Sequence, residues 1–350
     1  MGVQGFSELL KARAPQSTRP LPLSQMRGYI IAIDMNWLTH KEFSVAFDIA
    51  TRDIDLITQP VDNNMVMNIT VEHVIQRILK FLQLGITTVC VFDGPKHWLK
   101  TDQYCNPKRV EERQKRRETY EQLHQAYQTL GPFGMDLKQL ASYEKAIKAN
   151  YPFDFTIYQH LETILRAFGV PVVKSDQILI ETNDAEGVCA YLCRFHGCTM
   201  SYTSDTDYHV YGGEWQITDI DNGVCTVRCL SDILLQLDVS YLQLVDICIL
   251  MGNDFNARLP RKTGPSKSYD EIKTKGSFLN SRFANEPVFH WYHYIVNLYT
   301  SATQVAASDT PNIVTTMQWQ CLTTAHENPI VQYFQLSNYA PRFQACQQLF

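Results

Sequence analysis

The chain has 350 residues and a formal net charge of −5 at pH 7, with 45% hydrophobic and 19% charged residues. This length allows one large α/β domain with attachments or two small domains, and the composition is that of an ordinary globular protein. No apolar run approaches the length of a membrane-spanning helix. The first residues, MGVQGFSELLK, have neither the apolar core of a secretory signal nor a myristoylation pattern. We therefore expect no membrane partner.

The ten cysteines are scattered along the chain. Cys189, Cys193 and Cys198 lie near His196, but this segment has no Cys-x-x-Cys pair and lacks a second pair of zinc ligands. We interpret these cysteines as small buried side chains of one helix and the next strand. Reduced thiols are typical of an intracellular compartment, which we expect for this protein.

Two short apolar segments, residues 28–34 and 86–93, each end in an aspartate and are predicted to be buried strands. Between them, residues 71–84 repeat apolar side chains at helical spacing. The resulting strand–helix–strand unit favours an α/β fold with a mostly parallel central sheet and helices on both faces. Residues 52–70 lack such a pattern and are interpreted as a loop-rich insertion.

A similar series follows further along the chain. The spacing predicts a helix at 158–168, a strand at 170–173, a helix at 185–195, a strand at 198–202 and a helix at 240–251. Residues 96–151 interrupt the sheet pattern, because they are strongly charged and helical, with a Gly-Pro-Phe-Gly turn. We expect this segment to be a helical excursion from the sheet.

Carboxylates recur at the ends of these predicted elements. They are Asp34, Asp93, Asp184, Glu186, Asp205, Asp207 and Asp254. Each alone is typical of a turn residue or a helix cap. Ligand sites of parallel α/β sheets lie beyond the carboxyl ends of the strands, however, so we expect the seven side chains to converge.

So many like charges would repel one another and bind protons unless a hard cation lay among them. Two Mg²⁺ ions held in this way can activate a water and stabilise the leaving oxygen in phosphodiester hydrolysis. The carboxylates therefore predict a two-metal site.

The segments around these carboxylates resemble the flap endonuclease and xeroderma pigmentosum group G family of structure-specific 5′ nucleases. The resemblance runs over residues 1–275 and rests on MGVQG, AIDMN, VFDG, GVPVV, NDAEGVCAYL, TSDTD and LVDICILMGNDF. Asp184 replaces the usual glutamate, which is conservative for metal binding, and QILIET is an insertion. Since all seven family positions remain acidic, the resemblance implies an active enzyme with a PIN-like 5′-nuclease core.

The resemblance implies hydrolysis of DNA phosphodiesters near flaps, nicks, gaps or junctions, in replication, repair or recombination. Its metal ions would be two Mg²⁺, for which Mn²⁺ could substitute. Three alternatives stay open: a 5′→3′ exonuclease, a Holliday-junction resolvase and a catalytically silent DNA-binding scaffold.

In this family the region matching residues 96–150 forms a helical arch over the active site. Lys100 matches the catalytic lysine, and Arg109 matches the following arginine, with Arg113 as a substitute. These cations would hold the scissile phosphate. The eight basic residues between 96 and 117 would, by composition alone, equally describe a solvated helix with ion pairs.

The resemblance also implies further DNA contacts. His40 replaces a tyrosine of flap endonucleases and would stack on a nucleobase. His40 followed by Lys41 is similar to the related mismatch-repair exonuclease, although a surface histidine is the simpler alternative. Gly2 and Gln4 belong to the family segment where the duplex bends, and glycine permits a close backbone approach to DNA.

Residues 258–267 match the helix–two-turns–helix element that grips duplex phosphates, with contacts from Gly264, Ser266 and Lys267. Lys262 stands in place of the family's first glycine, which puts an associated K⁺ ion in question. The matches divide the chain into two nuclease regions at 1–95 and 151–257, an arch at 96–150, and a C-terminal region at 258–350.

From about residue 286 onward no resemblance is found. The last residues, FQACQQLF, lack the complete sliding-clamp peptide, and the long basic tail of cellular flap endonucleases is missing. Compact, divergent relatives occur in large DNA viruses, which suggests a viral source. We expect a monomer, located in the nucleus if cellular or at viral replication sites if viral.

Overall fold

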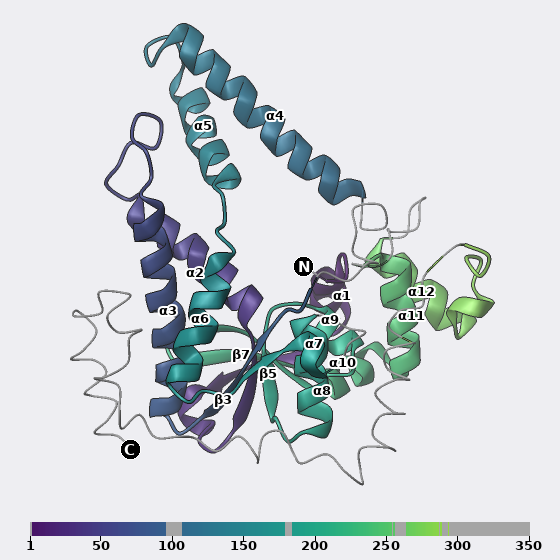
Figure 1. Cartoon of the computed structure of the whole chain (residues 1–350). Helices are drawn as coiled ribbons and strands as arrows, with labels where there is room; N and C mark the ends of the chain where they lie inside the picture. Colours follow the sequence, from purple (N-terminus) through teal and green to yellow (C-terminus); the bar gives the residue numbers. More distant parts are fainter. Residues whose placement is uncertain are drawn as a thin grey trace.

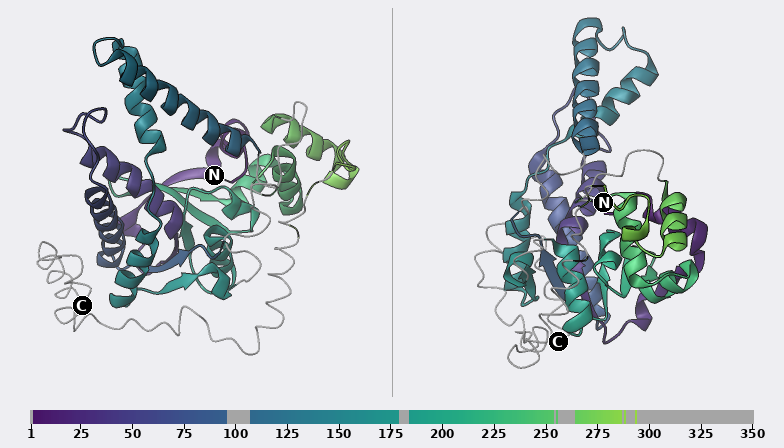
Figure 2. Two further views of the ribbon diagram at one scale, coloured as in Figure 1. Left: turned by 45° about the horizontal axis from the view of Figure 1, so that its top comes forward. Right: turned by 90° about the vertical axis from the view of Figure 1, so that its right-hand side faces the viewer.

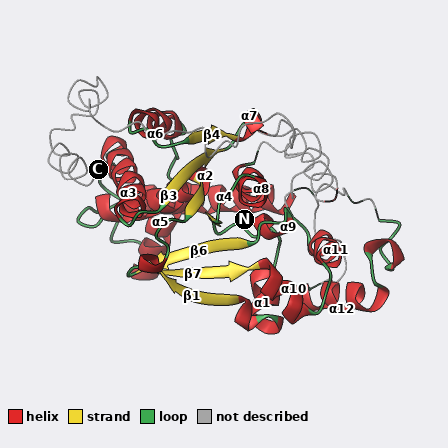
Figure 3. Ribbon diagram, turned by 90° about the horizontal axis from the view of Figure 1, so that it is seen from below, coloured by secondary structure: helices red, strands yellow, loops and turns green. Residues whose placement is uncertain are grey.

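The computed structural model of the chain describes residues 2–95, 107–178, 184–253, 255, 264–286, 288 and 293. Its strands form one seven-stranded sheet in the order β1-β7-β6-β5-β2-β3-β4 (Figure 3). Their bounds are β1 (Thr18–Pro22), β2 (Ile30–Asp34), β3 (Thr87–Phe92), β4 (Val172–Lys174), β5 (Met200–Tyr202), β6 (Trp215–Asp221) and β7 (Val224–Cys229). The strand pairs between β6 and β4 in this order are parallel, whereas the pairs β6–β7 and β7–β1 are antiparallel. The predicted mostly parallel sheet is therefore confirmed.

Helices cover both faces of this sheet (Figure 1). One face carries α2 (Met35–Ala50), α3 (Asn63–Gln83) and α6 (Thr156–Ala167). The other carries α1 (Phe6–Arg13), α8 (Ala185–Phe195), α10 (Leu230–Leu237) and α11 (Tyr241–Met251). Side chains alternate along a strand, so Ile31 and Ile33 enter the first core and Ala32 enters the second.

The described part of the chain also contains several short helices. They are α7 (Ser175–Ile178), α9 (Asp207–Val210) and the 3₁₀ turns η1 (Pro15–Ser17), η2 (Leu23–Gln25) and η4 (Phe278–Asn280). No single described helix is long and apolar enough to cross a membrane, and α10 with α11 passes that test only as a pair bent by 84°. Cys189 and Cys198 are buried, as the sequence predicts, whereas Cys193 is only partly buried.

The predicted helical excursion is a hairpin of two helices that projects away from the sheet (Figures 1 and 2). Its members are α4 (Pro107–Leu130) and α5 (Leu137–Asn150). Asp136 starts α5 through a capping box with Gln139. The two helices meet along a seam in which Tyr143, only 3% exposed, contacts the rings of Tyr120, His124 and Tyr127.

Several elements were not predicted, among them α2 and the β6–β7 hairpin, and one segment was predicted wrongly. Residues 63–70 are not a loop but the first turns of α3, because Asp62 accepts hydrogen bonds from the N–H groups of Asn64 and Met65. Helix α2 begins directly after Asp34. The β6–β7 hairpin turns at Asn222 and Gly223, whose φ angles of 48° and 80° suit the tight hairpin turn that this dipeptide favours.

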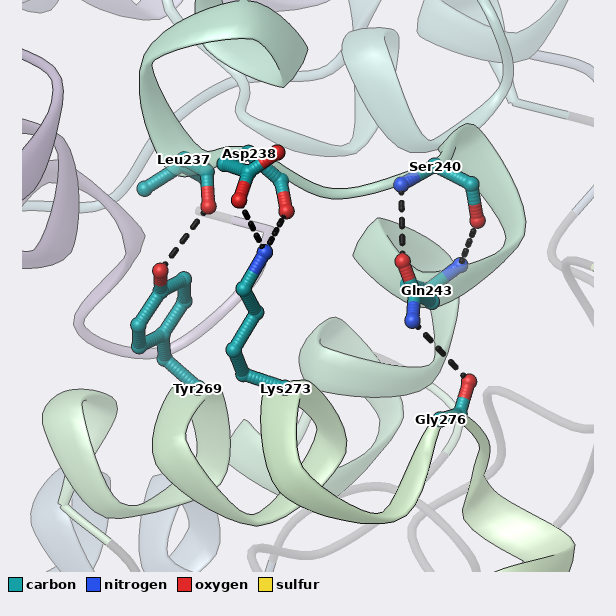
Figure 4. A network of polar contacts seen from close by, with 7 residues as sticks. All are labelled: Leu237, Asp238, Ser240, Gln243, Tyr269, Lys273 and Gly276. Atoms are coloured by element: carbon teal, nitrogen blue, oxygen red, sulfur yellow. Dashed lines mark hydrogen bonds and ion pairs between the residues drawn. The ribbon is translucent and has the colours of Figure 1, made fainter.

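Polar contacts hold the C-terminal half of helix α12 (Pro265–Lys275) against the core (Figure 4). The contacts are Tyr269 Oη to Leu237 O at 2.8 Å, Lys273 Nζ to Asp238 Oδ2 at 2.6 Å, and Gln243 Nε2 to Gly276 O at 3.2 Å. Ser240 and Gln243 also form the capping box of α11. The position of α12 against α11 is thereby fixed.

Candidate active site

Three neighbouring strands deliver aspartates to one edge of the sheet. Asp34 is the last residue of β2, Asp93 follows β3, and Asp205 follows β5. Strand β2 pairs in parallel with both β3 and β5, so the carboxyl ends of the three strands lie side by side. This is the edge at which ligands bind in parallel α/β sheets.

Asp34 is buried, with 4% of its surface exposed. Its Oδ1 accepts a hydrogen bond of 3.0 Å from the Trp37 N–H and so caps α2, while Oδ2 accepts one of 3.0 Å from the Thr203 hydroxyl. Burial raises the pKa of Asp34 to about 6, although the hydrogen bond from Trp37 acts in the opposite direction. The charge of Asp205 adds to this rise in pKa.

The loop after β5 is folded by hydrogen bonds within its own motif. The Asp205 N–H donates to Thr203 Oγ1 at 3.1 Å, and the Asp207 N–H donates to Asp205 Oδ1 at 3.2 Å. Thr203 therefore links Asp34 to Asp205, and Asp207 is fully buried. Thr203 lies inside the motif TSDTD but is not among the predicted site residues.

The N-terminal segment packs directly against this loop. The Val3 N–H donates to Thr206 Oγ1 at 2.8 Å, and the Gln4 N–H donates to the Gly252 carbonyl at 3.0 Å. Gly2 has a φ of +52°, and a Cβ on it would stand 2.1 Å from Asp205 Oδ1 and 2.7 Å from Asp207 Oδ1. Because Gly2 has no side chain, the N-terminal backbone can lie close to Asp205 and Asp207.

Asp93 joins the strand ends to the start of α8. Its carboxylate is exposed, and Oδ1 accepts a hydrogen bond of 2.8 Å from the Ala185 N–H, at the first turn of α8. The Asp93 N–H in turn donates to Asn36 Oδ1 at 2.9 Å. Asp184 is the N-cap residue of α8 but its side chain makes no cap hydrogen bond, and the carboxylate of Asp93 accepts from the first turn instead.

The other two carboxylates of this group open α8. Asp184 and Glu186 are buried, with 6% and 8% of their surfaces exposed. The Tyr211 hydroxyl donates to Asp184 Oδ2 at 3.4 Å, and the Tyr211 N–H donates to the Asp207 carbonyl at 2.9 Å. Tyr211 thus connects the α8 carboxylates with those of the loop after β5.

Six of the seven predicted carboxylates lie along this edge, and Asp254 lies outside the described residues. Their oxygen donors suit a hard divalent cation, and the pKa of Asp34 is raised mainly by burial, with a smaller contribution from the charge of Asp205. Within the described residues, no three Asp, Glu, His or Cys side chains are grouped closely enough to hold a metal ion. The donor chemistry fits a divalent metal, whereas a complete ligand set is not assembled there.

The predicted arch cations are described only in part. Lys100 and the side chain of Arg109 lie outside the described residues, while Arg113 is exposed on α4. Nearby, Lys115 pairs with Glu111 at 2.6 Å and Arg117 with Glu121 at 3.1 Å. The ion-paired helix that composition predicted is therefore present, and a DNA-binding role for these residues stays a prediction.

His40 and Lys41 lie beside the carboxylate edge on α2. The His40 ring packs against Phe153, with ring centroids 4.1 Å apart and planes tilted by 35°, and desolvation of the ring lowers the pKa of His40. Lys41 Nζ lies 2.6 Å from Asp219 Oδ1 and 5.3 Å from the Trp37 ring centroid. Their predicted contacts with DNA remain predictions.

The N-terminus of α12 lies next to the N-terminal segment. Gly264 precedes the helix, Pro265 starts it, and Ser266 and Lys267 are exposed in its first turn. A Cβ on Gly5 would stand 2.5 Å from Pro265 Cγ, so this glycine also allows close packing within the protein. Residues 256–263, which include Lys262 and the questioned K⁺ site, lie outside the described residues.

Comparison with known proteins agrees with this geometry. The model of the XPG N-terminal domain matches residues 1–117, and that of the XPG I-region matches residues 169–254. Flap endonuclease 1 of Entamoeba dispar is 30% identical over 288 residues, which are 80% of this chain and 69% of the relative. The chain belongs to the flap endonuclease and XPG family. Both matched regions contain described carboxylates of the candidate site.

Other members of the family are longer or more distant. Flap endonuclease 1 of Theileria parva is 27% identical, and the match covers 78% of this chain but only 51% of the relative. The chain thus spans about half the length of that relative. Among solved structures, the catalytic core of Rad2 in complex with DNA substrate has a TM-score of 0.58 at 16% identity, covering 100% of both chains. Flap endonuclease-1 from Methanococcus jannaschii has a TM-score of 0.52 at 17% identity, covering 81% of both. These likenesses show a shared fold.

Proposed function

We propose that this protein is a structure-specific 5′ nuclease that hydrolyses DNA phosphodiesters near junctions between single and double strands. The observation that carries the proposal is the row of carboxylates at the ends of β5, β2 and β3, next to the start of α8. Family membership supports nuclease chemistry at this edge. Within the structure-specific 5′ nucleases, we propose that it acts as a flap endonuclease.

The described carboxylates would hold the divalent metal, which we propose is Mg²⁺ with Mn²⁺ as a substitute. Asp34, Asp93, Asp184, Glu186, Asp205 and Asp207 are the ligands, with Asp254 as the seventh. Bound there, the metal would supply a nucleophilic water and stabilise the leaving oxygen. The chain's own part is to keep these oxygens aligned, through Thr203, Tyr211 and the Ala185 N–H.

The helical hairpin supports a substrate with a single-stranded end. Helix α4 carries basic, exposed side chains and starts on the same side of the molecule as the N-terminal segment (Figure 2). We propose that Lys100, and Arg109 or Arg113, neutralise the scissile phosphate from this hairpin. The first turn of α12, with Ser266 and Lys267, would contact duplex phosphates.

A cleavage assay with four DNA substrates tests the proposal. Flap, nicked, blunt and four-way substrates of unrelated sequences are incubated with the protein and Mg²⁺. We expect the flap to be cut fastest, at one position relative to the junction, because phosphate contacts carry no sequence information. Preferred cutting of blunt ends would instead indicate an exonuclease, and symmetrical cutting of the four-way substrate a resolvase.

Binding without cleavage of any substrate would contradict the proposal and indicate a DNA-binding scaffold. Cuts that follow a base sequence would contradict structure-directed incision. The assay therefore separates the proposed function from each alternative.

A further inference from the structure

A pocket of about 570 Å³ lies beside the carboxylate edge, against α6 and the ends of β3 and β4. Asp93 is part of its lining, so the pocket opens next to the proposed metal ligands. Its volume falls in the range of about 300–1,000 Å³ that is typical of small-molecule sites. The motifs AIDMN and VFDG contain Asn36, Phe92 and Asp93, but not the rest of the lining.

One wall of the pocket is aromatic. Phe155 lies between α5 and α6 and is 69% exposed. Neighbouring rings hold it in place: the centroid of Phe153 is 5.2 Å away and that of Tyr158 is 6.3 Å away. A fixed, exposed ring of this kind is the platform on which single-stranded nucleic acids stack their bases.

Another part of the pocket is cationic. Lys174 Nζ lies 2.9 Å from Glu162 Oε2, and Arg166 NH2 lies 3.2 Å from Glu162 Oε1. The pocket lining therefore contains two cations and two carboxylates, and one of these carboxylates, Asp93, is a proposed metal ligand. Glu162 is the less exposed partner at 18%, whereas Lys174 and Arg166 are 42% and 48% exposed. The carboxylate therefore positions two half-exposed cations, whose charge and N–H geometry suit a phosphate.

We propose that this pocket binds one nucleotide of the cleaved DNA strand, the first on the single-stranded side of the scissile phosphate. Its base stacks on Phe155, and its phosphate contacts Arg166 and Lys174. Asp93 borders both the pocket and the carboxylate edge, so a nucleotide bound here adjoins the phosphate at that edge. Phe155 also lies in the short segment between the end of α5 at Asn150 and the start of α6 at Thr156, so it is at the base of the hairpin, where a single strand would arrive.

This inference rests on the proposed nuclease function. Its test is a thermodynamic cycle in which one residue of the protein and one nucleotide of the substrate are changed separately and together. The full chain and its Phe155→Ala variant are compared on flaps whose first single-stranded nucleotide is intact or lacks its base. Half-saturating enzyme concentrations are measured in single-turnover cleavage. Loss of the base should weaken the wild-type interaction about fivefold or more, and should have no effect in Phe155→Ala.

Phe133→Ala is the matched control, because Phe133 is fully exposed in the turn between α4 and α5. This variant should respond to base loss as the wild type does. Moving the abasic site along the flap should show that only the first nucleotide matters. Melting temperatures within a few degrees of the wild type would verify that each variant is folded.

The phosphate contact is tested separately. A neutral methylphosphonate at the first flap linkage should weaken wild-type binding about two- to fivefold, and should have less effect in Arg166→Ala and Lys174→Ala. An equal cost of base loss in wild type and Phe155→Ala would overturn the nucleotide pocket while leaving the nuclease function intact. A wild-type protein that cleaves no substrate would instead refute the proposed function itself.

Discussion

Gly2 is the residue at which the N-terminal segment meets the loop after β5. An alanine there would require a positive φ and would bring its Cβ within 2.5 Å of Thr206 Oγ1 as well as onto the neighbouring aspartates. Small displacements of reacting groups cost rate steeply, so we expect Gly2→Ala to lower kcat at least about tenfold. Single-turnover kinetics on a flap substrate measures this.

Gly28→Ala is the control for backbone strain. Gly28 has a φ of +82°, but an added Cβ would meet nothing within 4 Å. This variant should lose about 1 kcal/mol of stability and keep its kcat. Equal losses of kcat in the two variants would show that strain, rather than contact with the aspartates, determines the effect of Gly2→Ala.

His209 is a buried group whose titration affects stability. Burial lowers its pKa to about 3, and its Nδ1 lies 2.9 Å from the Gly213 carbonyl. The unfolded chain has the ordinary value of about 6.5, so it binds a proton between pH 6.5 and 3 while the folded protein does not. The contribution of neutral His209 to the free energy of unfolding is therefore fully present above pH 6.5. It falls by about 1.4 kcal/mol for each pH unit below that value.

Replacing His209 should remove this contribution. We expect the unfolding free energy of His209→Gln to fall less between pH 7.5 and pH 5 than that of the wild type, by roughly 2 kcal/mol. Urea unfolding at the two pH values measures the difference. Equal pH dependence in both proteins would mean that His209 is accessible to protons in the folded state.

At the scale of elements, the α4–α5 hairpin depends on its own seam, because both helices project from the sheet (Figure 1). Tyr143 lies at the centre of this seam, and removing a buried aromatic side chain costs about 3–5 kcal/mol. We expect Tyr143→Ala to abolish hydrogen-exchange protection in residues 110–150 while leaving β2 and β3 protected. Protection that persisted in the hairpin would show that other contacts hold it.

Elements with strong local signals could be predicted from the sequence. Helix α8 occupies the predicted residues 185–195, since its apolar spacing is regular. Helix α2 is not among the predicted elements, although a helix cap is one of the roles that the sequence alone indicates for Asp34. The β6–β7 hairpin carries an Asn-Gly signal at Asn222 that would have revealed it.

At the scale of the whole molecule, the motifs predicted which carboxylates gather, but not how they are held. The hydrogen bond from the Ala185 N–H to Asp93 joins residues 92 positions apart, and that from Thr203 to Asp34 joins residues 169 apart. Such pairings depend on strand order, which local spacing does not encode. For the same reason, the pocket around Phe155 and Glu162 has no signature in the sequence.

The carboxylate edge is tested most directly by cleavage of a flap substrate in Mg²⁺ by Asp93→Asn, with Asp53→Asn as the control. Both changes remove one negative charge, but Asp53 is an exposed residue after α2. We predict that Asp93→Asn lowers kcat on the order of a thousandfold while duplex binding stays measurable, and that Asp53→Asn cleaves as the wild type does. Undiminished cleavage by Asp93→Asn would contradict a nuclease site at this edge.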